Sequence, residues 1–150
     1  MTRTLTPLLA ALFLACAPMA HAAPPAEAAA PAASDVAKVV YHINDASVAR
    51  AAMNNMNNEL NASPTDKIVV VTHGKGIDFL LNDAKDDKGA FESQVAALKN
   101  RGVDFRVCNN TLMSRKLGPD AVIMEAKVVP SGVAELARLQ AKEGYVYIKP

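Results

Sequence analysis

Apolar and polar residues alternate in two recurring ways along the chain from residue 36 onward. Short runs rich in Val and Ile are typical of strands, whereas apolar residues that recur every three or four positions are typical of helices. On this basis the sequence predicts strands over residues 36–43, 67–72, 103–108, 127–129 and 145–148. It predicts helices over 46–61, 91–101, 112–117 and 132–143, a short helical turn over 77–82 and an ambiguous stretch over 121–124.

Capping residues and the order of these segments indicate the fold class. Asn44 and Asp45 cap the helix over 46–61, and Ser131 caps the helix over 132–143. The run Ile68–Val71 is apolar throughout, which favours a strand buried on both faces of a parallel sheet. Strands separated mostly by helices therefore predict a three-layer α/β/α sandwich with a mostly parallel, Rossmann-like five-stranded sheet.

The first residues have the composition of a targeting segment. Arg3 supplies a positive charge, residues 5–17 are nearly all apolar, and Ala20–His21–Ala22 matches a small-x-small cleavage site. We expect a cleaved signal peptide over residues 1–22 and a periplasmic protein. A transmembrane anchor is disfavoured because the apolar run is shorter than the ~18 to 20 residues of a spanning helix, so we expect no membrane span after signal cleavage.

Two further interpretations concern the region before the domain. Cys16 could end a lipoprotein signal, but Phe13 stands where such signals usually have Leu, so this alternative is less favoured. Residues 23–34 are rich in Ala and Pro and offer little to bury, which predicts a disordered tether. Residues 35–150 then form one domain of ordinary size.

The charge balance disfavours nucleic acid as a partner. Of 16 Lys and Arg residues, Arg3 leaves with the signal, so 15 basic residues face 15 acidic ones. Trp is absent, and the basic residues are scattered among Asp and Glu instead of forming a stripe with aromatic residues.

The cysteine count singles out one side chain. Signal cleavage removes Cys16 and leaves Cys108, at the end of a predicted strand, without a partner in its own chain. The carboxyl ends of parallel strands lie at one edge of the sheet, where ligands bind, so polar residues at other strand ends should lie near it. We expect these crevice residues to be His42, Asn44, His73, Gly74, Lys75, Asn109, Asn110, Thr111 and Ser131.

Cys108 has two interpretations. It is a thiol nucleophile if a helix N-terminus after residues 109–111, Lys75 or the two histidines lower its pKa. It is an inert, buried small hydrophobe if it only packs in the core. Strand alternation puts Cys108 on the same face as Asp104 and Arg106, and this more polar face favours an accessible thiol.

The neighbouring histidines also have two interpretations. His42 and His73 either act as bases or orienting groups for the thiol or are hydrogen-bonded structural residues. With Cys108 they could hold a zinc ion, but the sequence has no close ligand pair such as C-x-x-C. The segment Gly74–Gly76 lacks the full pattern of a dinucleotide or P-loop motif. We therefore expect no metal and no cofactor.

Three segments, in order, resemble the DsrE/DsrF family of small sulfur-handling proteins. They are Phe105–Leu112, Val128–Leu136 and Gly144–Pro150, and the resemblance covers roughly the whole domain. It implies a Rossmann-like α/β fold, sulfur carried as a persulfide on a cysteine, and assembly into homo- or hetero-oligomers.

The sequence and the resemblance together predict an exported small thiol protein that binds or transfers sulfane sulfur as a persulfide on Cys108. Such a sulfurtransferase or sulfur carrier would exchange sulfur with a donor or acceptor protein. We also expect a homo-oligomer that covers part of residues 112–124, because an edge strand must be protected from further pairing. The alternative is a non-catalytic small-ligand or partner-binding module in which Cys108 is structural.

Overall fold

A computed structural model of the protein describes residues 36–150. The predicted signal peptide over 1–22 and tether over 23–34 lie outside the described residues. Within 36–150, no helix combines the length and the apolar character needed to cross a membrane.

Five strands form one parallel sheet, as the sequence predicts. They are β1 (Lys38–Asp45), β2 (Lys67–Lys75), β5 (Asp104–Cys108), β6 (Ala126–Val129) and β7 (Val146–Ile148). The strand order is β6-β5-β2-β1-β7, and every neighbouring pair is parallel. Because all strands run the same way, their carboxyl ends lie at one edge of the sheet.

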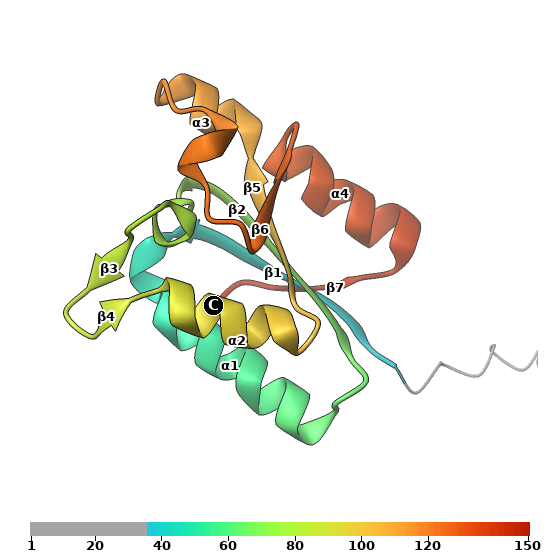
Figure 1. The fold of residues 1–150 in the computed structure, drawn as a ribbon. Coiled ribbons are helices and arrows are strands. Elements are labelled where there is room, and N and C mark those ends of the chain that lie inside the picture. The colour runs from blue at the N-terminus through green and yellow to red at the C-terminus, as the bar shows by residue number, and fades with distance from the viewer. Residues whose placement is uncertain (1–35) are drawn as a thin grey trace, which may run out of the picture. The chain divides into compact units, whose positions relative to one another are not determined.

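The helices cover both faces of this sheet. Figure 1 shows α1 (Ala49–Ala62) and α2 (Glu92–Asn100) on one face and α4 (Gly132–Glu143) on the opposite face. The chain moves from β1 through β2 and β5 to β6 in one direction and then returns past β1 to β7. Right-handed crossovers in opposite directions place their helices on opposite faces, which produces the three layers.

Two buried clusters hold the layers together. The larger cluster lies between the sheet and α1 and α2, where Met53 and Met56 meet Phe105. The smaller one lies under α4. It consists of Val40, Val69, Val71, Leu136 and Leu139. Successive strand residues point to opposite faces, so β1 and β2 contribute to both clusters.

The structure corrects three local predictions. The helix predicted over 112–117 is α3 (Asn109–Ser114), which begins directly after Cys108 and ends before Lys116, whose φ is 57°. Between residues 83 and 90, where the sequence predicts neither a strand nor a helix, the chain forms a short antiparallel hairpin of β3 (Lys85–Asp86) and β4 (Gly89–Ala90). The ambiguous stretch over 121–124 forms an antiparallel bridge between Val122 and Leu81.

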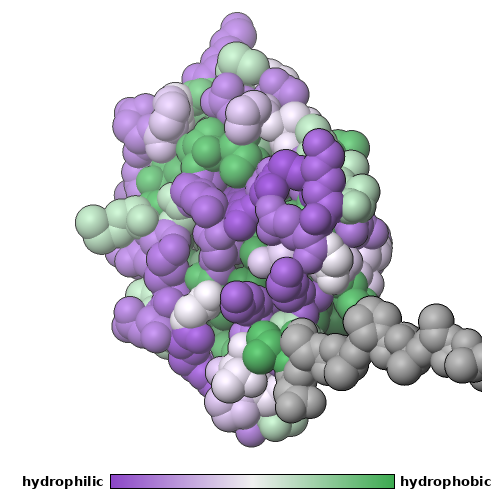
Figure 2. Space-filling model, turned by 90° about the vertical axis from the view of Figure 1, so that its right-hand side faces the viewer, coloured by the Kyte–Doolittle hydropathy of each residue, from purple (hydrophilic) through white to green (hydrophobic). Residues whose placement is uncertain are grey.

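Single helical turns connect the remaining elements. They are η1 (Ala46–Val48), η2 (Asp78–Leu80) and η3 (Pro119–Ala121). On the surface, hydrophobic side chains are interrupted by hydrophilic ones, as Figure 2 shows for one side of the molecule. Large exposed hydrophobic residues include Met113, Met124, Val133, Val146 and Tyr147.

Candidate functional site

The α4 face of the sheet carries polar side chains at its carboxyl edge. Val40 and Val71 belong to the buried cluster under α4, and His42 and His73 are the next residues on the same face of their strands. Cys108 ends β5 on this face, in parallel pairing with the last residue of β6. The sheet thus brings together side chains that are far apart in the sequence.

The sulfur of Cys108 lies in a ring of hydrogen-bond donors. Backbone N–H groups of Gly132, Thr111 and Asn110 donate to it, as does the Thr111 hydroxyl. Two of these residues belong to the first turn of α3, and Gly132 is the first residue of α4. The two helices therefore begin around the same atom.

This ring makes the thiol acidic. Burial on its own would raise the pKa of Cys108, but the bonds from Gly132, Thr111 and Asn110 stabilise the thiolate. The net pKa lies below the ordinary value of 9.0. A lowered pKa increases the fraction present as thiolate, which is the nucleophilic form.

The expectation of an accessible thiol is wrong. Cys108 is only 5% exposed, because the first turn of α4 lies across the polar face of β5. Arg106 on the same face is also buried, in ion pairs with Asp104 and Glu135. The polar residues on this face of β5 therefore form buried ion pairs and do not contact solvent.

A second layer of contacts orients the Thr111 hydroxyl. The backbone N–H of Gly74 donates to Thr111 Oγ1 at 3.1 Å. Gly74 has a φ of +58°, a left-handed conformation that glycine adopts at little cost. Because its oxygen accepts from Gly74, the hydroxyl directs its own hydrogen to the sulfur.

Gly132 fits tightly between strand ends. A Cβ at this position would lie 3.2 Å from Cys108 Cβ, 3.2 Å from the Thr72 carbonyl oxygen and 3.4 Å from His73 Cβ. Only a glycine lets α4 start this close to the sheet. The same contacts put the bases of the Cys108 and His73 side chains on neighbouring sides of Gly132.

His42 and His73 form a hydrogen-bonded pair beside the thiol. Their Nε2 atoms are 2.6 Å apart, and His42 Nδ1 is 2.6 Å from the hydroxyl oxygen of Tyr147. Three strands, β7, β1 and β2, thus contribute one side chain each to a continuous chain of hydrogen bonds.

Both imidazoles are held in the neutral form. Burial, the neighbouring His73 and the Lys149 ammonium lower the pKa of His42 from 6.5 to about 4. Burial and Lys149 also lower the pKa of His73. Lys149 is fixed near the pair by donating to the Asn44 side-chain oxygen at 2.6 Å.

The remaining predicted residues have other roles. Lys75 lies at the end of β2, where it is paired with Asp45, and does not contribute to the pKa shift of the thiol. The Ser131 hydroxyl caps α4 by accepting from the N–H of Ala134. Asn109 is the half-buried first residue of α3.

Sequence reasoning placed Gly132 at this edge but missed Tyr147 and Lys149. A glycine directly after the N-cap Ser131 was a weak signal for close approach at the start of α4. Tyr147 and Lys149 gave no signal, because their proximity to His42 and Asn44 depends on β7 pairing with β1. Strand order is not visible in local patterns.

The described part of the chain offers little for a metal ion. Among residues 36–150, no group of three or more His, Cys, Asp or Glu side chains is placed to bind one. The 2.6 Å between the Nε2 atoms of His42 and His73 is a hydrogen-bond distance, too short for an ion to lie between the rings.

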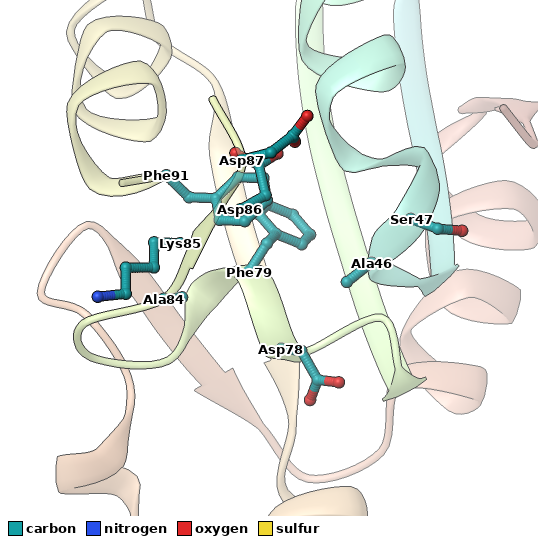
Figure 3. Close-up of a pocket in the computed structure, with 9 residues that line it drawn as sticks. All are labelled: Ala46, Ser47, Asp78, Phe79, Ala84, Lys85, Asp86, Asp87 and Phe91. Carbon is teal, nitrogen blue, oxygen red and sulfur yellow. The ribbon is translucent and has the colours of Figure 1, made fainter. Parts of the chain in front are cut away.

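A cavity of about 430 Å³ lies elsewhere, among η1, η2 and the β3–β4 hairpin. In Figure 3, Ala46 and Ser47 form one wall, and aspartates and phenylalanines gather opposite. Phe79 and Phe91 belong to the larger core cluster, so this cavity is on the side of α1 and α2. None of its lining residues contacts the Cys108 sulfur.

Comparison with known proteins places this chain in a family. Residues 19–150 match the DsrE/DsrF-like family. The protein of unknown function MTH1491 from Methanobacterium thermoautotrophicum is 30% identical, with a TM-score of 0.69 over 76% of this chain and 99% of its own. The ychN protein from E. coli shares the fold, with a TM-score of 0.63 at 12% identity, over 77% of this chain and 100% of its own. No curated protein matches the chain. The chain belongs to the DsrE/DsrF-like family, which is implicated in sulfur metabolism.

Proposed function

We propose that this protein carries sulfane sulfur as a persulfide on Cys108. The observation that supports the proposal most is the ring of donors from Gly132, Thr111 and Asn110 around the sulfur. These donors stabilise a negative charge on sulfur, and the thiolate is the form that attacks a sulfur donor.

The transfer involves no net oxidation. The Cys108 thiol loses its proton, and its sulfur attacks the terminal sulfur of a donor persulfide. A new S–S bond forms on Cys108 as the S–S bond of the donor breaks. The electron pair of the broken bond leaves with the donor as a thiolate, which takes a proton from solvent. Because Cys108 is 5% exposed, we expect a donor whose terminal sulfur projects, on a small molecule or on a loop of a donor protein.

Incubation of the purified protein with cysteine persulfide tests the proposal. We expect a mass increase of one sulfur atom on the peptide that contains Cys108, reversed by dithiothreitol. Cys108→Ser should lose the adduct and keep its fold, because the serine oxygen can accept the same N–H bonds. In full-length protein that retains residues 1–22, Cys16→Ser is the matched control and should keep the adduct. An unmodified wild-type protein would refute the proposal.

A second candidate is a small-ligand or partner-binding module with a structural cysteine. It is favoured by the burial of Cys108 and by the separate cavity of about 430 Å³. Under this proposal Cys108 resists alkylation until the protein is denatured. Fast alkylation of the folded protein at neutral pH would exclude it.

A separate proposal concerns where the protein acts. We propose export to the periplasm, since Arg3, residues 5–17 and the small residues at 20–22 form a signal peptide pattern. The mature N-terminus should then be Ala23 by sequencing, and a full-length product would contradict export.

We also propose a homo-oligomer that buries part of residues 112–124. This segment includes Met113 and Met124, whose exposed fractions of 59% and 90% are high for large apolar side chains. Sedimentation at micromolar concentration should show a species larger than the monomer. A monomer alone would count against this proposal.

A further inference from the structure

We propose that Tyr147, His42 and His73 form a proton relay that takes the proton from the Cys108 thiol to solvent when the sulfur reacts. This inference rests on the proposed function, because it assigns residues to the proton step of that reaction. It concerns side chains on β7, β1 and β2, none of which is itself a donor in the ring around the sulfur.

The hydrogen-bond distances define the path. The Tyr147 hydroxyl, the His42 ring and the His73 ring are joined by two contacts of 2.6 Å each. Only one hydrogen can lie between two Nε2 atoms, so one ring donates and the other accepts. If His73 carries its hydrogen on Nε2, then His42 carries its hydrogen on Nδ1 and donates it to Tyr147.

One end of the chain starts beside Cys108 in the sheet, and the other end is exposed. His73 is the inner end, because its Cβ and that of Cys108 both lie next to the position that a Cβ on Gly132 would take, at 3.4 and 3.2 Å. Tyr147 is the outer end and is 40% exposed. The proton of a thiol that is 5% exposed thus has a route through side chains.

Proton movement along this route balances. The Cys108 proton goes to His73 Nδ1, directly or through one water molecule, while the His73 Nε2 hydrogen moves to His42 Nε2. The His42 Nδ1 hydrogen moves to Tyr147, and the tyrosine releases its own hydrogen to solvent. When the persulfide is discharged and the Cys108 thiolate returns, Tyr147 takes a hydrogen from solvent and the other three transfers reverse, so the relay is reset in each cycle.

The local charges suit this role. Lys149, directly after β7, carries a positive charge that lowers the pKa of both histidines and so favours their neutral forms. On α4, Glu135 points to Arg106 and Arg138 instead of the histidines. Both imidazoles therefore keep one unprotonated ring nitrogen each at neutral pH, which a relay requires.

Tyr147→Phe is the sharpest test, since it removes one exposed hydroxyl and keeps the ring. Tyr145→Phe, two residues earlier in the chain, is the matched control. We expect Tyr147→Phe to slow sulfur uptake from cysteine persulfide by about tenfold or more, within the usual range for general acid–base steps. Tyr145→Phe should leave the rate unchanged. Equal rates for Tyr147→Phe and wild type would overturn the relay.

Solvent isotope effects separate a relay from a structural role. In mixtures of H2O and D2O, the wild-type rate should depend non-linearly on the deuterium fraction, because several protons move together. The dependence should become linear in Tyr147→Phe and stay curved in Tyr145→Phe. A linear dependence in the wild-type protein would refute the concerted movement.

The relay can be judged separately from the sulfur chemistry. Alkylation by iodoacetamide forms an S–C bond at Cys108, expels iodide and releases the same thiol proton. If the wild-type protein takes up no sulfur but Tyr147→Phe still slows alkylation below pH 7, then the proposed function fails and the relay stands. If sulfur uptake occurs but neither rate responds to Tyr147→Phe, then the relay fails alone.

Nitrogen-15 NMR of the histidine side chains provides a readout without any reaction. At pH 7 we expect two neutral rings in opposite tautomers, with one Nε2 protonated and the other not. Tyr147→Phe should change the tautomer populations of both rings together. Two rings with the same protonated nitrogen would contradict the hydrogen-bonded pair.

Discussion

The Thr111 hydroxyl gives a direct test of how the protein stabilises a thiolate. It donates to the Cys108 sulfur and accepts from the N–H of Gly74 at 3.1 Å. Thr111→Val removes this hydroxyl and keeps nearly the same side-chain shape. The backbone N–H groups of Gly132, Asn110 and residue 111 itself stay in place, so the substitution isolates one of the donors.

The magnitude follows from the charge on the acceptor. A hydrogen bond to a charged group is worth about 1.5 to 3 kcal/mol, and about 1.4 kcal/mol corresponds to a tenfold change in an equilibrium constant. Losing the hydroxyl should raise the pKa of Cys108 and reduce the thiolate population at neutral pH by about tenfold or more. Stability should change little, because Gly74 is exposed and water can accept from its N–H.

The pH dependence of alkylation by iodoacetamide measures this effect. Because only the thiolate reacts, we expect the profile of Thr111→Val to move to higher pH and to rejoin the wild-type plateau in alkaline solution. Thr111→Ser keeps a hydroxyl and is the control; its profile should stay close to that of the wild type. Superimposed profiles for Thr111→Val and wild type would refute the assigned role, as would a Ser variant that behaves like Val.

Three further predictions concern stability. The unfolded chain binds a proton on His42 near pH 6.5, whereas the folded chain binds it only near pH 4. The contribution of His42 to the unfolding free energy is therefore complete above pH 6.5 and is lost as the pH drops through 4. His42→Gln should flatten that part of a plot of urea midpoint against pH, and an unchanged slope would contradict this prediction. Gly132→Ala should reduce the unfolding free energy by about 1 to 3 kcal/mol and slow alkylation of the thiol. Val133→Ala, at the exposed next position, should reduce it by under about 0.5 kcal/mol. Equal losses of unfolding free energy in chemical denaturation would rule out the close packing at Gly132. Arg106→Ala should cost about 1.5 to 3 kcal/mol, because Asp104 and Glu135 lose their buried partner and keep only Lys127 and Arg138. Arg115→Ala in an exposed ion pair should cost under about 1 kcal/mol, and a thermal unfolding comparison that shows equal effects would disprove this difference.

Local signals in the sequence were sufficient for most of the fold. Ser131 before a periodic apolar segment predicted the start of α4, whose N-cap is Ser131 in the structure. The Ile68–Val71 run predicted a central parallel strand, and β2 is paired on both sides. The resemblance carried by the three segments was also confirmed by the family match.

What the sequence could not provide depends on contacts between distant segments. Alternation along β5 placed Cys108 on a polar face but could not show that Gly132 would cover it. The start of α3 was predicted too late because Asn109 and Asn110 are typical of turns, whereas in the structure they begin the helix and the N–H groups of Asn110 and Thr111 donate to the sulfur. The Tyr147 contact requires β7 to lie beside β1.

The pairing of β7 with β1 also affects the order in which the protein can fold. Tyr147 and its partner His42 are 105 residues apart in the chain. At about 5 to 20 residues per second, a ribosome needs roughly 5 to 20 s to synthesise the segment between them. Until then β1 has β2 on one side and an open edge on the other. Both strands that carry the histidine pair are therefore complete well before β7, which supplies the tyrosine and covers that edge.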